Sequence, residues 1–192
     1  MILTSWDDGA KDDLMVLSLL RKYKLPAIFF VPIESWGFLN LNVYNGFKVG
    51  GHTYRHPQDL KLLSPEELEV EIGLATKVMA KKVGYRPEWF CYPRGRYNEA
   101  VVERVKAAGY KYARTTKIGV SGKQFEKNGF HCYERSEYDW RSWEDYIINA
   151  INEAKPTDEV HIWGHSWEIA KHDEWRKLER VLAYAADHNQ QS

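Results

Sequence analysis

The sequence predicts an α/β fold in which parallel strands alternate with helices. Short apolar runs suited to buried strands alternate along the chain with segments of helical spacing. No repeat, low-complexity tract or linker interrupts this alternation, so we expect a single domain spanning residues 1–192. Polar residues also follow several predicted strands directly, as expected where parallel strands end at one face of a sheet or barrel.

The expected strands are short, and one of them is continuously apolar. Residues 27–31 read Ala-Ile-Phe-Phe-Val, the pattern of a strand buried on both faces. The full set of predicted strands covers residues 2–6, 27–31, 47–49, 88–92, 110–114, 131–134 and 159–163.

The expected helices are marked by their capping residues. Ser64, Pro65 and Glu67 form the clearest start, because a serine cap, a proline at the first helical position and a capping-box glutamate coincide. The predicted helices cover residues 11–23, 65–82, 98–108, 143–154 and 175–186, and residues 34–45 and 118–129 are predicted to be loops.

Composition excludes several functional classes. The 192 residues contain 27 Lys plus Arg and 27 Asp plus Glu, so the chain lacks the basic excess of a general nucleic-acid binder. No apolar run is long enough to span a membrane, and no signal peptide is evident, so we expect a cytoplasmic protein. Cys91 and Cys132 have no CxxC partner and are expected to be free thiols. The oligomeric state is left undetermined.

Asp7, Asp8 and Gly9 follow the first predicted strand. Glycine tolerates the backbone angles of a sharp turn, and adjacent side chains of an extended strand point in opposite directions. The carboxylates of Asp7 and Asp8 can therefore have different functional roles. Taken alone, such a segment is most often a solvated turn.

Three histidines make a functional interpretation stronger. His52 and His56 are four residues apart, and on a helical turn that spacing places both imidazoles on one face, where they can share a metal. With Asp8 they offer two nitrogens and one oxygen, which leaves positions open for water and substrate. His165 follows an apolar strand and is expected at the same face. The alternative is that each histidine is a surface, capping or core residue.

Five segments resemble, in order, the motifs of the NodB-type polysaccharide deacetylases, carbohydrate esterase family 4. The first reads Thr-Ser-Trp-Asp-Asp-Gly, where the family usually has Thr-Phe-Asp-Asp-Gly, and the second reads His-Thr-Tyr-Arg-His-Pro. The five segments are residues 4–9, 52–57, 90–95, 139–140 and 162–165.

The resemblance implies a distorted (β/α) barrel with fewer than eight strands. It also implies one divalent metal ion, usually zinc with cobalt or nickel as alternatives, held by Asp8, His52 and His56. Asp7 would be the general base, and His165 would be the general acid that protonates the leaving group. Asp139 would hydrogen-bond His165 and raise its pKa.

The third motif departs from the family pattern. Cys91 stands where the family has the arginine that orients the base, and Arg94 stands where it usually has tyrosine. Three accounts of Arg94 remain open: it pairs with Asp7, it binds substrate, or it is solvated. We favour substrate binding, because three positions along a strand reverse the side-chain direction. The expected substrate contacts are Arg94, Tyr92, Trp140 and Trp163.

The leading hypothesis is a metal-dependent hydrolase that removes N-linked or O-linked acetyl groups from an N-acetylated sugar or polysaccharide. The same chemistry on a small soluble amide is an alternative, suggested by the expected cytoplasmic location. A catalytically silent sugar-binding relative is disfavoured, because it has no use for the intact Asp7 and His165. A non-haem iron oxygenase also uses two histidines and a carboxylate, but it needs no such acid–base pair.

Overall fold

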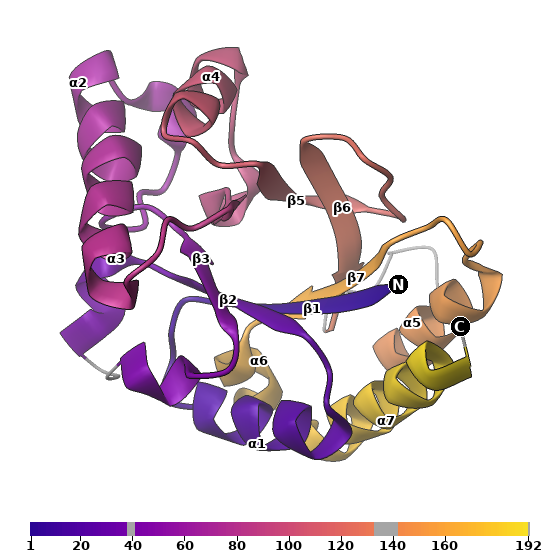
Figure 1. Cartoon of the computed structure of the whole chain (residues 1–192). Coiled ribbons are helices and arrows are strands. Elements are labelled where there is room, and N and C mark those ends of the chain that lie inside the picture. Colours follow the sequence, from indigo (N-terminus) through magenta and orange to yellow (C-terminus); the bar gives the residue numbers. More distant parts are fainter. Residues whose placement is uncertain (38–40, 133–141, 192) are drawn as a thin grey trace.

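The computed structural model describes residues 1–37, 41–132 and 142–191, and it is built around a closed barrel of parallel strands (Figure 1). Neighbouring strands follow chain order, and the last strand pairs back to the first. Seven strands are present in these residues: β1 (Ile2–Asp7), β2 (Ala27–Val31), β3 (Lys48–Gly51), β4 (Trp89–Cys91), β5 (Tyr112–Ile118), β6 (Glu126–His131) and β7 (Val160–Gly164). The predicted α/β barrel with fewer than eight strands is confirmed.

Helices surround the barrel on its outer face (Figure 1). They are α1 (Asp13–Tyr23), α2 (Pro65–Leu68), a π-helical turn (Glu69–Leu74), α3 (Ala75–Val83), α4 (Glu99–Ala107), α5 (Trp143–Glu153), α6 (Ser166–Lys171) and α7 (Trp175–Gln191). The capping box is present, since the Ser64 hydroxyl accepts from the Glu67 amide and the Glu67 carboxylate accepts from the Ser64 amide. Among the described residues, no helix combines the length and apolar character needed to cross a membrane.

One prediction of local structure is wrong, and one helix was not predicted. Residues 126–131, assigned mainly to a loop, form β6, and the short α6 was not predicted. Gly129 suggested a loop, but it lies within β6. Glycine is needed there because a Cβ would lie 2.4 Å from the His161 carbonyl oxygen on the neighbouring β7. The predicted loop over residues 34–45 contains 3-10 turns at Ile33–Gly37 and Leu41–Tyr44.

The apolar core follows the alternation of the strands. Ile2 and Trp6 of β1 belong to the large cluster that includes buried residues of α1, α5 and α7. Leu3 belongs instead to a small cluster with Ile28, Phe30, Trp89 and Cys91. Because side chains alternate along a strand, we assign this second set to the barrel interior.

The pairing between β3 and β4 is the sparsest of the barrel. Gly51 and Phe90 are the only register partners assigned there, whereas β1 and β7 share five. The paired residue Gly51 directly precedes His52. The first predicted histidine ligand therefore follows the strand pair with the fewest register partners.

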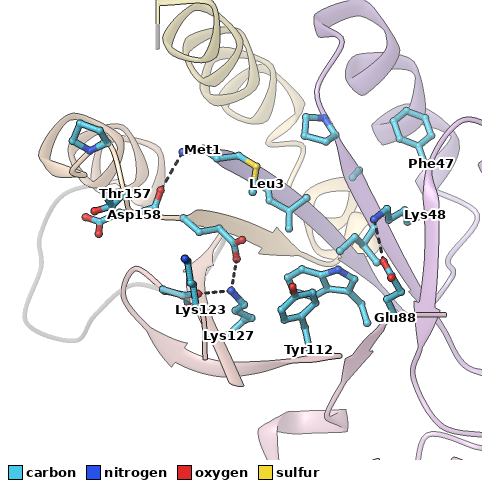
Figure 2. Close-up of a pocket in the computed structure, with 18 of the residues that line it drawn as sticks. Met1, Leu3, Phe47, Lys48, Glu88, Tyr112, Lys123, Lys127, Thr157 and Asp158 are labelled. Atoms are coloured by element: carbon cyan, nitrogen blue, oxygen red, sulfur yellow. Dashed lines mark hydrogen bonds and ion pairs between the residues drawn. The ribbon is translucent and has the colours of Figure 1, made fainter. Parts of the chain in front are cut away.

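The two ends of the barrel differ in chemistry. A hollow of about 870 Å³ opens at the N-terminal ends of the strands (Figure 2). Its lining mixes apolar side chains such as Leu3 with a buried Lys127, which pairs with Glu159 at 3.6 Å. All of the predicted polar site residues that the structure describes lie at the opposite end, where the strands terminate.

The turn after β1 needs glycine at position 9. Asp8 and Gly9 both have positive φ angles, of 76° and 64°. A Cβ on Gly9 would lie 2.6 Å from Cγ1 of Val31, which is too close for any side chain. The expected tight turn is therefore present, and it directs Asp7 and Asp8 into the end of the barrel.

Replacing Gly9 with alanine should lower the free energy of unfolding more than replacing Gly46 does. Both glycines have positive φ, but a Cβ on Gly46 meets nothing within 4 Å. Left-handed backbone strain, about 1–2 kcal/mol, is therefore common to both, and overpacking adds about 1–3 kcal/mol only in Gly9→Ala. Urea unfolding of both variants measures the difference, and equal losses would contradict the close approach to Val31.

Candidate active site

A cleft of about 450 Å³ lies at the C-terminal ends of the strands. It gathers eight of the ten predicted site residues: Asp7, Asp8, His52, His56, Tyr92, Arg94, Trp163 and His165. The remaining two, Asp139 and Trp140, lie outside the described residues. Residues far apart in the sequence therefore meet in one place, as the positions of the predicted strand ends required.

Asp8 faces both histidines of the second motif. Its Oδ1 atom lies 3.6 Å from Nε2 of His52 and 3.5 Å from Nε2 of His56. Its other oxygen, Oδ2, accepts a hydrogen bond of 3.0 Å from the indole nitrogen of Trp167. One oxygen is thus held by the indole while the other is left to face the two imidazoles.

The loop carrying the two histidines is not the helical turn that we expected. Thr53 and His56 have positive φ angles, of 68° and 58°, and the Thr53 hydroxyl accepts from the His56 amide at 3.0 Å. Buried Glu71, in the π-helical turn, accepts from the amides of Tyr54 and Arg55 at 3.0 and 2.9 Å. The imidazoles converge because this hydrogen-bonded loop folds back, and their ring centroids are 4.7 Å apart.

The donor set formed by Asp8, His52 and His56 fits a divalent metal ion. His52 Nδ1 donates to the Cys91 carbonyl at 2.9 Å, which orients the ring so that Nε2 faces Asp8. Burial and the neighbouring His52 lower the pKa of His56 to about 4, so its imidazole is neutral and can coordinate near neutral pH. Ligand atoms of a tetrahedral zinc lie about 3.4 Å apart, close to the separations from Asp8.

Asp7 forms a buried ion pair with a residue that the sequence analysis did not identify. The guanidinium of Arg114, on β5, donates to Oδ2 of Asp7, and both side chains are buried. The same guanidinium lies 3.9 Å from the ring centroid of Trp163. Burial alone would raise the pKa of Asp7, but Arg114, aided by His52 and His165, outweighs it and holds that pKa below its usual value.

Cys91 explains why the arginine comes from another strand. Cys91 and Arg114 are register partners on the adjacent strands β4 and β5. The Cys91 sulfur lies 2.7 Å from the Arg114 guanidinium and 3.5 Å from Asp7 Oδ2. The cation expected at position 91 is therefore supplied from one strand further along, at the same level of the barrel. The available signal was an arginine at the end of the predicted strand 110–114, and in the structure it is the third residue of β5.

Arg94 is not the partner of Asp7. It is exposed, with a φ of 56°, in the short 3-10 turn after β4. The strand ends at Cys91, so the argument from strand alternation does not apply to Arg94. Its position in the cleft lining is compatible with substrate contact.

The two described aromatic candidates are mostly buried. Tyr92 is 1% exposed and its ring stacks on Tyr97, with centroids 4.2 Å apart. Trp163 is 3% exposed and lies beneath the Arg114 guanidinium, beside His131. Both line the cleft, but Trp167, which was not predicted, is the more exposed aromatic there.

His165 lies between the aspartate pair and a carboxylate. Its Nε2 is 3.9 Å from Oδ2 of both Asp7 and Asp8, and its Nδ1 is 2.7 Å from Glu168 Oε2. Burial opposes a charge on this ring, but Glu168 and then the two aspartates raise the pKa of His165 above its usual value. Glu168, three positions after the histidine, therefore makes the kind of contact with His165 that was expected of Asp139, and the prediction for Asp139 lies outside the described residues.

Replacing Arg114 with methionine should cost about 3–5 kcal/mol of unfolding free energy at pH 7 in metal-free protein, because Asp7 is left buried and unpaired. The wild-type pair stabilises above the unfolded pKa of aspartate, near 3.9, and this contribution is lost as pH falls through the lowered folded pKa. In the variant, burial raises the pKa of Asp7, so the loss should shrink at pH 4, where Asp7 is protonated.

Arg94→Met is the matched control, because it removes an exposed arginine from the same cleft. It should change the unfolding free energy by no more than about 0.5 kcal/mol. Urea titrations at the two pH values measure both variants. A loss for Arg114→Met that matches the control, or that is as large at pH 4 as at pH 7, would contradict the ion pair.

Residues 1–113 match the family model described as polysaccharide deacetylase. A peptidoglycan-N-acetylglucosamine deacetylase, PgdA, from Listeria monocytogenes is 30% identical over 110 residues, or 54% of this chain and 23% of the relative. A peptidoglycan-N-acetylglucosamine deacetylase from Bacillus cereus is 34% identical over 117 residues, or 58% of this chain and 54% of the relative. The matches thus span about half or less of these relatives' own lengths.

Solved structures show the same fold. A family 4 carbohydrate esterase from Streptomyces lividans aligns with a TM-score of 0.66 and 20% identity, covering 96% of this chain and 88% of that one. A family 4 acetyl xylan esterase from Clostridium thermocellum, solved with a cobalt ion, gives 0.65 and 18%, covering 95% and 82%. A family 4 pseudoenzyme from Bacillus anthracis gives 0.64 and 15%, covering 94% and 60%. The chain therefore belongs to the polysaccharide deacetylase family, and its fold is that of the family 4 carbohydrate esterases.

Proposed function

We propose that this protein is a metal-dependent deacetylase that hydrolyses the N-acetyl amide of a sugar, with residues 1–192 forming one catalytic domain. The observation that carries the proposal is the arrangement around Asp8. Its metal-binding oxygen faces His52 and His56, while Asp7 and His165 flank it with Nε2 of His165 3.9 Å from both aspartates. Groups suited to act as base, acid and metal ligands thus line one cleft, which supports the proposal.

Asp8, His52 and His56 would hold the ion, with zinc favoured and cobalt or nickel as alternatives. Polarisation of the acyl carbonyl and a lowered pKa of water are the chemistry that a divalent ion supplies at such a site. The donor set leaves coordination positions for water and substrate, which distinguishes it from a closed structural site.

Asp7 is suited to accept a proton from the attacking water. Arg114 holds its carboxylate in the ionised form, and the ion pair fixes which oxygen is engaged: Oδ2 accepts from Arg114, while the buried Oδ1 has no hydrogen-bond partner among the described residues. An ionised carboxylate with a free oxygen beside a metal site can act as a general base.

His165 is suited to protonate the leaving amine. Glu168 accepts from Nδ1 and favours the imidazolium form, while Nε2 points toward the aspartates and the cleft. Amide hydrolysis needs this second group, because an amine leaves poorly unless its nitrogen is protonated. Glu168 therefore acts on the reaction through His165, as a positioning residue.

An N-acetylated sugar is the favoured substrate. The relatives from Listeria monocytogenes and Bacillus cereus are named for peptidoglycan N-acetylglucosamine, and a cleft of about 450 Å³ lies within the range of small-ligand pockets. Arg94 and Trp167 stand at the open side, where a guanidinium and an indole can contact hydroxyl groups and a sugar face. A small soluble amide remains the alternative substrate.

Acetate release should be detectable on soluble N-acetyl sugars or chito-oligosaccharides when zinc or cobalt is supplied. Asp7→Asn and His165→Ala should each lower kcat by about 10²–10⁴-fold, because each removes one proton-transfer group. Both variants should still bind one ion tightly, as measured by metal analysis after dialysis. Activity within tenfold of wild type in either variant, or no acetate release from any substrate in the panel, would overturn the proposal.

The basic limb of the pH–rate profile should depend on Glu168. The acid must carry its proton, so activity falls as pH rises through the pKa of His165, and Glu168 raises that pKa. Glu168→Gln should therefore move the basic limb to lower pH. Glu66→Gln removes an exposed carboxylate from α2 and serves as the control. If the basic limb of Glu168→Gln stays where it is in the wild type, Glu168 does not set the pKa of the general acid.

A further inference from the structure

We propose that His131, His165 and Glu168 form a second metal site beside the catalytic centre, and that zinc bound there inhibits the enzyme. None of these residues belongs to the set that faces Asp8 Oδ1. Metal binding at the new site stands on its own geometry. The inhibition rests on the proposed function, because it acts through the acid His165.

The three donor atoms form a compact triangle. Nε2 of His131 lies 3.4 Å from Nδ1 of His165 and 3.2 Å from Oε2 of Glu168, and Nδ1 of His165 lies 2.7 Å from the same oxygen. Ligands of a tetrahedral zinc are about 3.4 Å apart, so the shortest edge must lengthen by about 0.7 Å and the edge between His131 and Glu168 by about 0.2 Å. Two imidazoles and a glutamate are a donor set that zinc accepts, with one position left for water.

The triangle is held by the fold and is open on one side. His131 ends β6 and is 6% exposed, with its ring 4.1 Å from the ring of Trp163, between centroids. His165 and Glu168 are half-buried at the beginning of α6, and all three residues line the cleft. An ion that enters the cleft can therefore reach donors that the fold has already brought together.

The two sites can be filled together, because they use different atoms. His165 offers Nδ1 to the new site, whereas its Nε2 faces Asp7 and Asp8. Asp8, His52 and His56 contribute nothing to the triangle. Occupancy of one site therefore leaves the ligands of the other in place.

Inhibition follows from the chemistry of imidazole. A metal ion at Nδ1 needs the lone pair of that nitrogen, so the proton that His165 shares with Glu168 is released to solvent. The ring then carries a single proton, on Nε2, and it belongs to a neutral imidazole rather than an imidazolium. Such a group is a far weaker acid, so the leaving amine is no longer protonated efficiently.

Metal stoichiometry tests the site directly. Equilibrium dialysis of the full chain against micromolar to millimolar zinc should give two ions per wild-type chain, one tight and one weaker. His131→Ala and Glu168→Gln should each keep the tight ion and bind the second at least about tenfold more weakly. The double variant Asp8→Asn/His56→Ala should lose the tight ion and keep the weaker one. His188→Ala, a histidine of α7 outside the cleft lining, should bind two ions.

Activity provides the second readout, expressed within each variant as the ratio of rates in excess and in stoichiometric zinc. Excess zinc should lower the wild-type rate at least about tenfold and lower that of His131→Ala much less. Saturation of the wild type at one ion, or a second ion that persists in both His131→Ala and Glu168→Gln, would overturn the site. Two ions without any deacetylase activity would leave the metal site standing and remove the proposed function.

Discussion

The buried pair of Asp7 and Arg114 is the constraint on which the catalytic end of the barrel depends. A carboxylate with 3% exposure is costly unless a cation and hydrogen bonds compensate its lost hydration. The closed barrel provides the burial, and β5 provides the cation at the level of Asp7. The Arg114 guanidinium also lies over the ring of Trp163, so its position is held both by Asp7 and by this indole.

The fold could be predicted from the sequence because its signals are local. Capping residues, a continuously apolar strand and polar residues at strand ends each reflect a preference acting over a few positions. Asp7, Asp8, His52, His56 and His165 were found for the same reason, since each lies within a short motif. The position of β6 was predicted wrongly because Gly129 is required by the close approach of the neighbouring strand β7, which the local sequence does not show.

The residues that the sequence analysis missed act across elements. Arg114 reaches Asp7 only because β4 and β5 are neighbours in register, and no spacing in the sequence reveals that adjacency. Glu71 supports the histidine loop from a helical segment, through two amide hydrogen bonds. Glu168 follows His165 by three residues, a spacing that is visible in the sequence, whereas the prediction for Asp139 lies outside the described residues and stays a prediction.

His52 has a structural duty that His56 lacks. The β3–β4 seam has one pair of register partners, and the His52 imidazole donates across it to the Cys91 carbonyl. This hydrogen bond joins β3 and β4 where they share only one register pair. The His52 ring therefore both presents Nε2 to the candidate metal site and helps to close the barrel. Loss of His52 would therefore remove a candidate metal ligand and also a hydrogen bond across the wall of the barrel, whereas loss of the His56 imidazole would leave that bond in place.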